Sequence, residues 1–323
     1  MHALVTGGGG FLGSGITKAL IQKGNNVTVI GRRKYPHLPP SAKVLQGDIR
    51  DYEFVKCCSK NVDVVFHTAA LPGIWGPKHE FFSVNVHGTE NIIKACRDNL
   101  IPKLVFTSSP SVVFGDSSLE GVNESVPYPD TYLCEYPSTK ALAEKMVLQA
   151  NDPTLCTTAI RPHLIWGPGD PHLVPRILQK ANSNRLIMVG EGRNQVDMIY
   201  IDNAVSAHLK AALAPNTNVA GKAYFVSDDD PVVLWKWINS LLHRLGLSNV
   251  KRKISYSNAM RLGAFLEEMY RFLRLKSEPP MTRFLASQLA TSHYFDISRA
   301  KKDFDYRPLV SQEEGINRLI HSL

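Results

Sequence analysis

A tyrosine and a lysine in the middle of the chain have the spacing needed for acid–base chemistry. The run Tyr136-Pro137-Ser138-Thr139-Lys140 opens a predicted helix and places the phenol and the ammonium one turn apart on one face. A cation beside a phenol favours the phenolate and lowers its pKa toward neutral pH. Such a group can give a proton to a ketone or take one from an alcohol. The pair taken alone is also common among surface neighbours on helices.

A cluster of hydroxyl groups precedes this pair along the chain. Thr107-Ser108-Ser109-Pro110-Ser111 stands at the end of a predicted strand over Leu104 to Ser108. Hydroxyls at such a strand end can orient a carbonyl oxygen by donating hydrogen bonds to it. We predict this role for Ser109, with Ser111 as the alternative.

Glycines at three-residue intervals follow the first predicted strand. Gly7, Gly10 and Gly13 lie in the run Thr6-Gly7-Gly8-Gly9-Gly10-Phe11-Leu12-Gly13, directly before a helical pattern. Glycine permits a tight turn and a close approach of the backbone to a pyrophosphate, whose charge the helix N-terminus favours. The run therefore predicts a dinucleotide site that includes Gly7, Gly10, Phe11, Leu12 and Gly13.

The ends of the next strands indicate which dinucleotide binds. After the second strand the chain reads Ile30-Gly31-Arg32-Arg33, without the carboxylate that usually contacts the ribose of NAD. Because guanidinium groups pair well with a 2′-phosphate, Arg32 and Arg33 favour NADP(H) over NAD(H); the alternative is a solvated surface pair. Further predicted cofactor contacts at strand ends are Asp48, Ile49, Ala69 and Ala70.

The elements that position these groups follow a strand–helix alternation. Predicted strands are Ala3 to Thr6, Val27 to Ile30, Lys43 to Gln46, Val62 to His67, Leu104 to Ser108 and Thr157 to Arg161, and predicted helices are Phe11 to Lys23, Phe82 to Asn99 and Tyr136 to Asn151. This alternation predicts an α/β fold with a Rossmann-type, doubly wound parallel sheet. We expect a cofactor domain over residues 1–165 and a smaller, mixed substrate domain over 166–323, with some of its segments returning to the first.

Composition limits the remaining possibilities. The chain has 323 residues, 44% of them hydrophobic and 20% charged, which is typical of a globular protein. Five cysteines without metal spacing predict buried thiols in a reducing compartment, with no metal site. The sequence shows no secretory signal pattern and no apolar run of membrane-spanning length, so we expect a cytoplasmic protein.

The charge excess is concentrated late in the chain. The formal net charge is +8, and between Arg244 and Arg283 nine basic residues face three acidic ones. A late helical pattern there puts large apolar residues on one face: Leu262, Phe265, Leu266, Met269, Phe272 and Leu273. This helix could pack on the core, cover an apolar pocket or face a membrane. No nucleic-acid module accompanies the basic segment, so nucleic acid is not an expected partner.

These motifs together resemble the extended short-chain dehydrogenase/reductase superfamily over nearly the whole chain. The resemblance rests on the glycine run, Phe106-Thr107-Ser108-Ser109, Tyr136 to Lys140, and Arg161-Pro162. It implies a catalytic triad of Ser109, Tyr136 and Lys140, hydride transfer at a nicotinamide, cofactor contacts from Tyr136, Lys140 and Pro162, and a homodimer. A non-catalytic NADP-binding protein is a different class that would typically lack the tyrosine or the lysine.

Narrower features resemble the 3β-hydroxysteroid dehydrogenase group and, within it, the bacterial 2-alkyl-3-ketoalkanoate reductases of long-chain olefin biosynthesis. The runs shared with the group are His67 to Ala70, Thr107 to Ser111 and Arg161 to Pro175. Those shared with the reductases are Ala69 to Gly76, Arg161 to Pro175, Gly192 to Asp197, Tyr200 to Asn203 and Thr282 to Leu285. The resemblance implies NADPH-dependent reduction of a β-keto acid; 3β-hydroxysteroid or sterol carboxylate oxidation is the alternative. Nucleotide-sugar epimerases and dehydratases usually carry arginine where Val196 stands, which makes a nucleotide-sugar substrate less favoured.

Large side chains near the expected pocket suggest an apolar substrate. Candidate substrate contacts are Trp75, Ser111, His163 and Trp166, although large apolar residues are usually core and histidines in loops are usually structural. The basic late segment could attract a carboxylate. It could also contact a membrane surface or another enzyme of the pathway.

Overall fold

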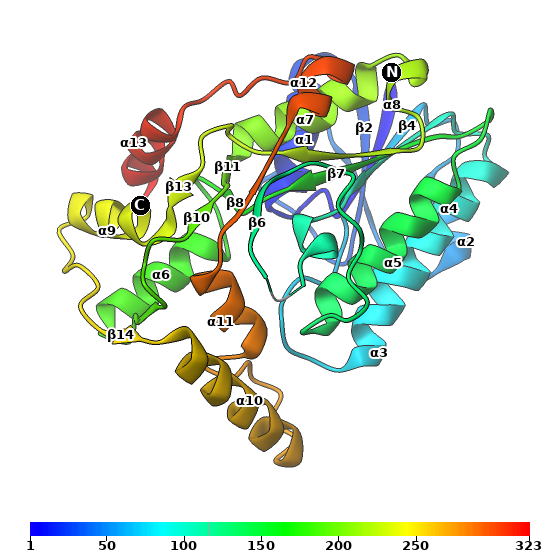
Figure 1. The fold of residues 1–323 in the computed structure, drawn as a ribbon. Helices are drawn as coiled ribbons and strands as arrows, with labels where there is room; N and C mark the ends of the chain where they lie inside the picture. The colour runs from blue at the N-terminus through cyan, green and yellow to red at the C-terminus, as the bar shows by residue number, and fades with distance from the viewer. Residues whose placement is uncertain (116) are drawn as a thin grey trace.

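A parallel sheet of seven strands forms the centre of the molecule (Figure 1). The computed structural model describes residues 1–115 and 117–323. In spatial order the strands are β3 (Lys43–Gln46), β2 (Asn26–Gly31), β1 (His2–Thr6), β4 (Val64–His67), β5 (Lys103–Thr107), β7 (Cys156–Pro162) and β12 (Lys222–Val226). All neighbours in this sheet pair in parallel. The Rossmann-type sheet and its six predicted strands are confirmed, with strand ends shifted by at most two residues.

Helices cover both faces of this sheet because both faces are apolar. Alternate strand residues point to opposite sides, so that Val5 and Phe66 join one core while Leu4 and Val65 join the other. One face is covered by α1 (Phe11–Gln22) and α7 (Ile201–Leu213). The other is covered by α2 (Tyr52–Cys58), α4 (Gly88–Asp98) and α5 (Glu135–Gln149). The predicted helix Phe82 to Asn99 begins instead with a π-helix over Phe82–His87, which follows α3 (Lys78–Phe81) and leads into α4.

The strand order reverses beside β1, whose neighbours are β2 on one side and β4 on the other. In doubly wound sheets the crevice at such a reversal, outside the carboxyl ends of the strands, is where ligands bind. The glycine run follows β1 at this point, and the predicted cofactor contacts follow β2, β3 and β4.

Shorter elements form a second, mixed unit below the main sheet. Its four-stranded sheet has the order β13 (Val232–Val233), β10 (Gln195–Val196), β15 (His293–Phe295) and β6 (Leu119–Val122). Two strand pairs are β11 (Ile199–Tyr200) with β8 (Ile165–Trp166), and β14 (Lys253–Ile254) with β9 (Met188–Val189). Its longer helices are α6 (Leu173–Asn182), α9 (Leu234–Arg244), α10 (Tyr256–Phe272), α11 (Arg283–Ala290) and α13 (Gln312–Ser322). Short helices complete the chain: a 3-10 turn (Pro110–Val113), α8 (Asn216–Val219) and α12 (Ser298–Phe304).

The two units exchange strands. β6 comes from the first half of the chain and pairs with β15, while β12 comes from the second half and pairs with β7. β6 therefore belongs to the second unit although it comes early in the chain, and β12 belongs to the main sheet although it comes late.

The structure bears on three expectations about burial. Trp166 is fully buried against Tyr200 and Trp237 and belongs to the core; its contact with a substrate stays a prediction. Not all the cysteines are buried thiols, since Cys57 is exposed. The apolar residues of α10 are divided, since Leu266 packs against a small buried cluster that includes Ala259 and Met281, whereas Phe265 and Phe272 are exposed.

Two further observations concern membrane spans and metal sites. Among residues 1–115 and 117–323, no helix is both long and apolar enough to cross a bilayer. Within the same residues, no cluster of three or more histidine, cysteine or carboxylate side chains could hold a metal ion.

Candidate active site

The glycine run forms a tight turn between β1 and α1. The Gly7 amide donates to the Ile30 carbonyl at 2.8 Å, and the Gly10 amide donates to the Gly7 carbonyl at 2.9 Å. Gly7 has φ +68°, and a methyl group there would lie 2.8 Å from the Ala69 Cα. No side chain caps the N-terminus of α1 and no acidic residue occupies its first turn. Free amides and a positive helix end suit the pyrophosphate of a dinucleotide.

Gly13 holds this turn closed and offers a direct test of it. A methyl group on Gly13 would lie 2.3 Å from the Gly7 carbonyl oxygen, so Gly13→Ala must distort the turn. Losing a single hydrogen bond to a charged phosphate costs about 1.5–3 kcal/mol, and we expect about tenfold or more weaker NADPH binding by fluorescence titration. Gly115→Ala is the control, because its nearest neighbour would lie at 3.7 Å. Equal affinities of the two variants would contradict the role of the turn.

A cleft of about 510 Å³ runs from this turn along the carboxyl ends of the strands. Its walls include the predicted residues Gly7, Gly10, Phe11, Leu12, Arg32, Asp48, Ile49, Ala69, Ala70, Tyr136 and Lys140. Arg33 is exposed outside the lining, and Pro162 is buried in β7, with Leu164 and Ile165 lining the cleft after it. The glycine turn and this continuous cleft fit a dinucleotide cofactor.

Near the Arg32 end of the cleft, Asp48 is held by a neighbour and Tyr35 lies close to the glycine turn. Asp48 accepts two hydrogen bonds from the Arg50 guanidinium, at 3.0 and 2.6 Å, which hold the Asp48 pKa below its usual value. The Tyr35 ring covers Gly9 and Gly31, where any side chain would collide with it. Sequence reasoning missed Tyr35, because it follows the strand in an irregular segment without a recognisable pattern.

Lys140 lies at the other end of the cleft, on the buried side of α5. Its Nζ donates to the Thr107 carbonyl at 2.6 Å and lies 3.9 Å from the centre of the Phe106 ring. Burial lowers the Lys140 pKa to about 7, although the negative charge of Glu144 opposes that shift. The lysine can therefore gain and lose a proton near neutral pH.

Tyr136 lies one turn earlier on α5, with Ser109 beside it. Burial raises the Tyr136 pKa to about 12, and a hydrogen bond with Ser109 opposes the rise. The predicted lowering of this pKa by Lys140 is wrong for this structure, because burial dominates and the ammonium is bound to Thr107. The phenol is therefore protonated at neutral pH, as a proton donor must be.

The two candidate serines occupy different positions in this arrangement. Ser111 donates to the Ser109 hydroxyl from its amide at 3.2 Å and from its own hydroxyl at 2.9 Å. Ser109 is the serine that acts on the Tyr136 pKa, whereas Ser111 is hydrogen-bonded to Ser109. This geometry favours Ser109 over Ser111 for contact with a carbonyl oxygen.

A buried ion pair links α5 to β7 of the main sheet. Glu144, one turn after Lys140, accepts hydrogen bonds from Arg161 Nε at 2.9 Å and Nη2 at 2.6 Å. The Tyr128 hydroxyl donates to the same carboxylate at 2.6 Å. Burial would raise the Glu144 pKa, but the bonds and the charge of Arg161 outweigh burial and hold it below its usual value. Glu144 is thus an anion near the Lys140 ammonium.

Asn85, in the π-helix, connects the loop after β4 to α5. Its amide donates to the Thr139 hydroxyl at 3.0 Å and to the Leu71 carbonyl at 3.3 Å, and its carbonyl accepts from the Leu71 amide at 2.7 Å. The side chain thus ties the loop after β4 to the residue before Lys140. Sequence patterns cannot reveal this role, because the π-helix that aims Asn85 inward looks like ordinary helix.

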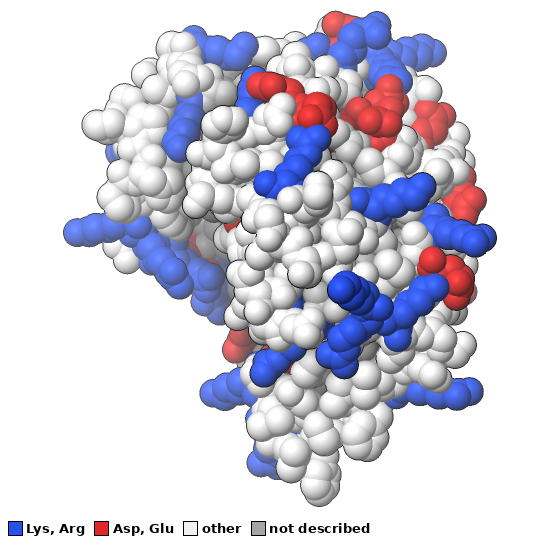
Figure 2. Space-filling view, turned by 90° about the vertical axis from the view of Figure 1, so that its left-hand side faces the viewer, with Lys and Arg blue, Asp and Glu red and all other residues white. Residues whose placement is uncertain are grey.

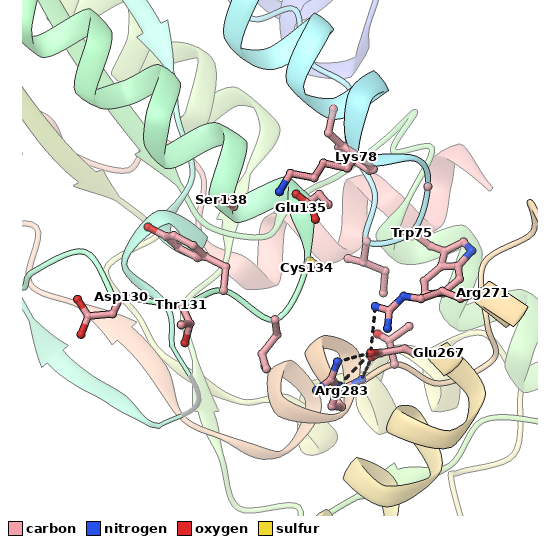
Figure 3. A pocket seen from close by; sticks show the side chains of 16 residues that line it. Trp75, Lys78, Asp130, Thr131, Cys134, Glu135, Ser138, Glu267, Arg271 and Arg283 are labelled. Carbon is pink, nitrogen blue, oxygen red and sulfur yellow. Dashed lines mark hydrogen bonds and ion pairs between the residues drawn. The ribbon is translucent and has the colours of Figure 1, made fainter. Parts of the chain in front are cut away.

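A second cavity of about 570 Å³ is lined by residues that flank Tyr136 in the chain, among them Cys134, Glu135 and Ser138 (Figure 3). These three residues, at the start of α5, contribute to one wall. Trp75 contributes to the facing side, where its indole N–H donates to the Leu275 carbonyl at 3.3 Å and Arg271 lies over its ring. The structure thus places Trp75 on an open cavity, as a substrate contact requires.

His163 is held in a buried pair rather than in a cavity wall. His163 Nε2 lies 2.6 Å from His293 Nδ1, while His293 Nε2 lies 3.0 Å from the Gln288 carbonyl. Because a carbonyl only accepts, His293 Nε2 carries its hydrogen and His163 Nε2 is the donor in the pair. Burial lowers both pKa values, that of His293 to about 4. These contacts give His163 a structural role, and its contact with a substrate stays a prediction.

Comparison with known proteins agrees with this architecture. The model of the 3-beta hydroxysteroid dehydrogenase/isomerase family matches residues 4–256. A 2-alkyl-3-oxoalkanoate reductase of Stenotrophomonas maltophilia (strain K279a) is 46% identical, over 99% of this chain and 98% of its own. The sterol-4-alpha-carboxylate 3-dehydrogenase, decarboxylating, of Mus musculus is 34% identical, over 98% of this chain and 90% of its own.

A solved structure confirms the fold beyond this family. The UDP-glucuronic acid 4-epimerase from Bacillus cereus in complex with NAD superposes with a TM-score of 0.78, at 21% identity, over 100% of this chain and 98% of the epimerase. Val196 stands where nucleotide-sugar epimerases usually carry an arginine. It is fully buried in β10, so this position offers no cation to a sugar diphosphate.

The chain belongs to the 3-beta hydroxysteroid dehydrogenase/isomerase family, within the extended short-chain dehydrogenases/reductases. It is an NAD(P)-dependent oxidoreductase with a Rossmann-type cofactor domain.

Proposed function

We propose that the chain uses NADPH to reduce the ketone of a 2-alkyl-3-oxoalkanoate to a secondary alcohol. The observation that carries this proposal is that Tyr136 and Lys140 line the cofactor cleft, while Cys134, Glu135 and Ser138, which flank Tyr136 in the chain, line the second cavity. The 46% identity to a 2-alkyl-3-oxoalkanoate reductase over nearly the full length supports this substrate class.

The proposed chemistry divides among three side chains. Ser109 orients the ketone oxygen by donating a hydrogen bond, and Tyr136 gives that oxygen its proton. Lys140, whose pKa burial lowers to about 7, takes up or releases a proton near neutral pH one helix turn from Tyr136. A bound nicotinamide supplies the hydride that reaches the carbonyl carbon. The oxygen gains the proton and the carbon gains the hydride, which completes the alcohol.

The second cavity is the proposed site for the rest of the substrate. It adjoins Tyr136 through Cys134 and Ser138, and its walls combine apolar side chains such as Ile74 and Phe81 with charged ones. Apolar walls suit an alkyl chain, whereas the Lys78 ammonium suits a carboxylate; Arg271 is already paired with Glu267 and Glu268.

The NADP(H) preference is proposed to depend on Arg32. Arg32 lines the cleft, whereas Arg33 lies outside the lining. Because a hydrogen bond to a charged group contributes about 1.5–3 kcal/mol, Arg32→Ala should weaken NADPH binding about tenfold to a hundredfold. NADH binding should change little. Titration of both cofactors measures this, with Arg33→Ala as the matched control; equal losses for NADPH and NADH would contradict a 2′-phosphate contact.

Oxidation of a 3β-hydroxysteroid or sterol carboxylate is the second candidate, favoured by the 34% identity to the mouse enzyme. Ser109, Tyr136 and Lys140 would then catalyse the reverse reaction, the oxidation of an alcohol to a ketone. The deciding assay follows nicotinamide absorbance of the purified chain with NADPH and a racemic 2-alkyl-3-oxo acid, beside a 3β-hydroxysteroid with NAD⁺. Turnover of the keto acid supports the proposal, and turnover of the steroid alone replaces it by the second candidate. The predicted homodimer and cytoplasmic location stay predictions.

A further inference from the structure

The helix α10 is held to the protein along one narrow side. Its buried residues Ala259, Gly263 and Glu267 recur every four positions. A methyl group at Gly263 would lie 2.7 Å from the backbone of Thr282 and Arg283, so the helix approaches the start of α11 very closely. Glu267 accepts a 2.7 Å hydrogen bond from the Arg283 amide and another of 2.7 Å from its guanidinium. The position of α10 is therefore fixed while its other sides are open.

Those open sides carry large apolar side chains. Phe265 is 64% exposed and Phe272 is 86% exposed. Eleven large apolar side chains are exposed in residues 1–115 and 117–323, and five of them lie on α10 or just after it: Leu262, Phe265, Phe272, Leu273 and Leu275. Single exposed apolar residues are ordinary, but a cluster of this kind marks an interaction surface.

Basic side chains accompany this apolar surface. Arg261, Arg274 and Lys276 are exposed, and no carboxylate in the described part of the chain forms an ion pair with them. In Figure 1, α10 is the lowest element and projects from the body. Figure 2 shows that the lowest lobe of the molecule is largely white, with blue side chains beside and above it. The surface is thus a convex apolar ridge with a positive rim.

We propose that α10 docks on the surface of an anionic phospholipid bilayer. Helices that lie in a bilayer interface place Phe and Leu at the acyl boundary and Lys or Arg at the headgroups. Phe265 and Phe272 take the first position, and Arg261, Arg274 and Lys276 take the second. The unpaired positive rim matches lipid phosphates, which attract nearby basic residues electrostatically. A projecting ridge enters a fluid interface without needing the fitted groove that a protein partner would have to supply.

The docked helix also borders the cavity beside Tyr136. Glu267 and Arg271 line that cavity from α10, and Leu275, just after the helix, accepts the hydrogen bond from Trp75. If the proposed function holds, a long-chain substrate passes from the bilayer to the cavity along this helix. The docking itself does not depend on which substrate the enzyme uses.

Vesicle sedimentation of the full chain tests the docking. We expect the chain to pellet at low salt with vesicles of phosphatidylcholine and phosphatidylglycerol, much less with phosphatidylcholine alone, and less at high salt. Phe265→Ser combined with Phe272→Ser should reduce binding about tenfold or more, because the buried apolar area is lost. Arg274→Gln combined with Lys276→Gln should reduce binding to the anionic vesicles. Leu309→Ser is the control, since Leu309 is an exposed leucine away from α10.

Three outcomes overturn the docking proposal. The first is that the chain does not bind anionic vesicles at low salt, and the second is that the double phenylalanine variant binds them as well as the wild type. The third is that the wild type forms an oligomer, measured by light scattering, which the phenylalanine variant disrupts, while vesicles bind neither form; α10 is then a protein interface. Turnover of a detergent-dispersed keto acid by the same samples separates the proposals, because its failure in the wild type counts against the function and leaves the vesicle result intact.

Discussion

Replacing Tyr136 with phenylalanine is expected to lower kcat by about a hundredfold to ten-thousandfold, since that is the usual contribution of a positioned proton donor. The hydroxyl that this change removes is the one that burial keeps protonated at neutral pH. NADPH affinity should remain close to that of the wild type, because the glycine turn and Arg32 lie at the far end of the cleft. Steady-state turnover and NADPH fluorescence titration measure the two quantities.

The serines provide the matched comparison for this variant. Ser109→Ala should also lower kcat strongly, whereas Ser111→Ala should have a smaller effect, because Ser109 is the serine that acts on the Tyr136 pKa and Ser111 bonds to Ser109. Unchanged turnover in Tyr136→Phe would contradict the assignment. A larger loss in Ser111→Ala than in Ser109→Ala would exchange the roles of the two serines.

The second large effect concerns stability. Glu144→Ala should destabilise the fold by about 3–5 kcal/mol, because it leaves the Arg161 guanidinium buried without its anion. The midpoint of urea unfolding measures this loss. The double change Glu144→Leu with Arg161→Met should recover much of it, since apolar residues of similar volume often replace buried ion pairs well.

The double variant distinguishes the origin of the effect. Equal destabilisation of the single and double variants would mean that shape, including the stacking of Arg161 over Phe225, matters more than charge. Removing the exposed Glu314 partner of Arg318 is the control and should change little, because solvent screens such pairs.

Local patterns were sufficient to predict the cofactor half of the molecule. Six short strands and the glycine turn after β1 have strong local signals, and all are found. Tyr136 and Lys140 were also recognisable, because their spacing on one helix is independent of the rest of the fold. The strand β12 was missed, since its position beside β7 depends on pairing with residues far away in the chain.

Tertiary contacts decided the points that sequence reasoning could not settle. Trp166 looks like a substrate contact next to a loop, but Tyr200 and Trp237 enclose it. The apolar side of α10 looks like a packing face, yet Gly263 allows a closer contact on another side. The Tyr136 pKa is set by burial, which no spacing of charged residues reveals.

The most direct test of the central claim follows a labelled hydride. The purified chain is incubated with a 2-alkyl-3-oxo acid and NADPH that carries deuterium at C4 of the nicotinamide, and the product is analysed by mass spectrometry. We predict a β-hydroxy acid with one deuterium on C3, formed by the wild type and hardly at all by Tyr136→Phe. No alcohol product, or an alcohol without deuterium at C3, would contradict ketone reduction at this site.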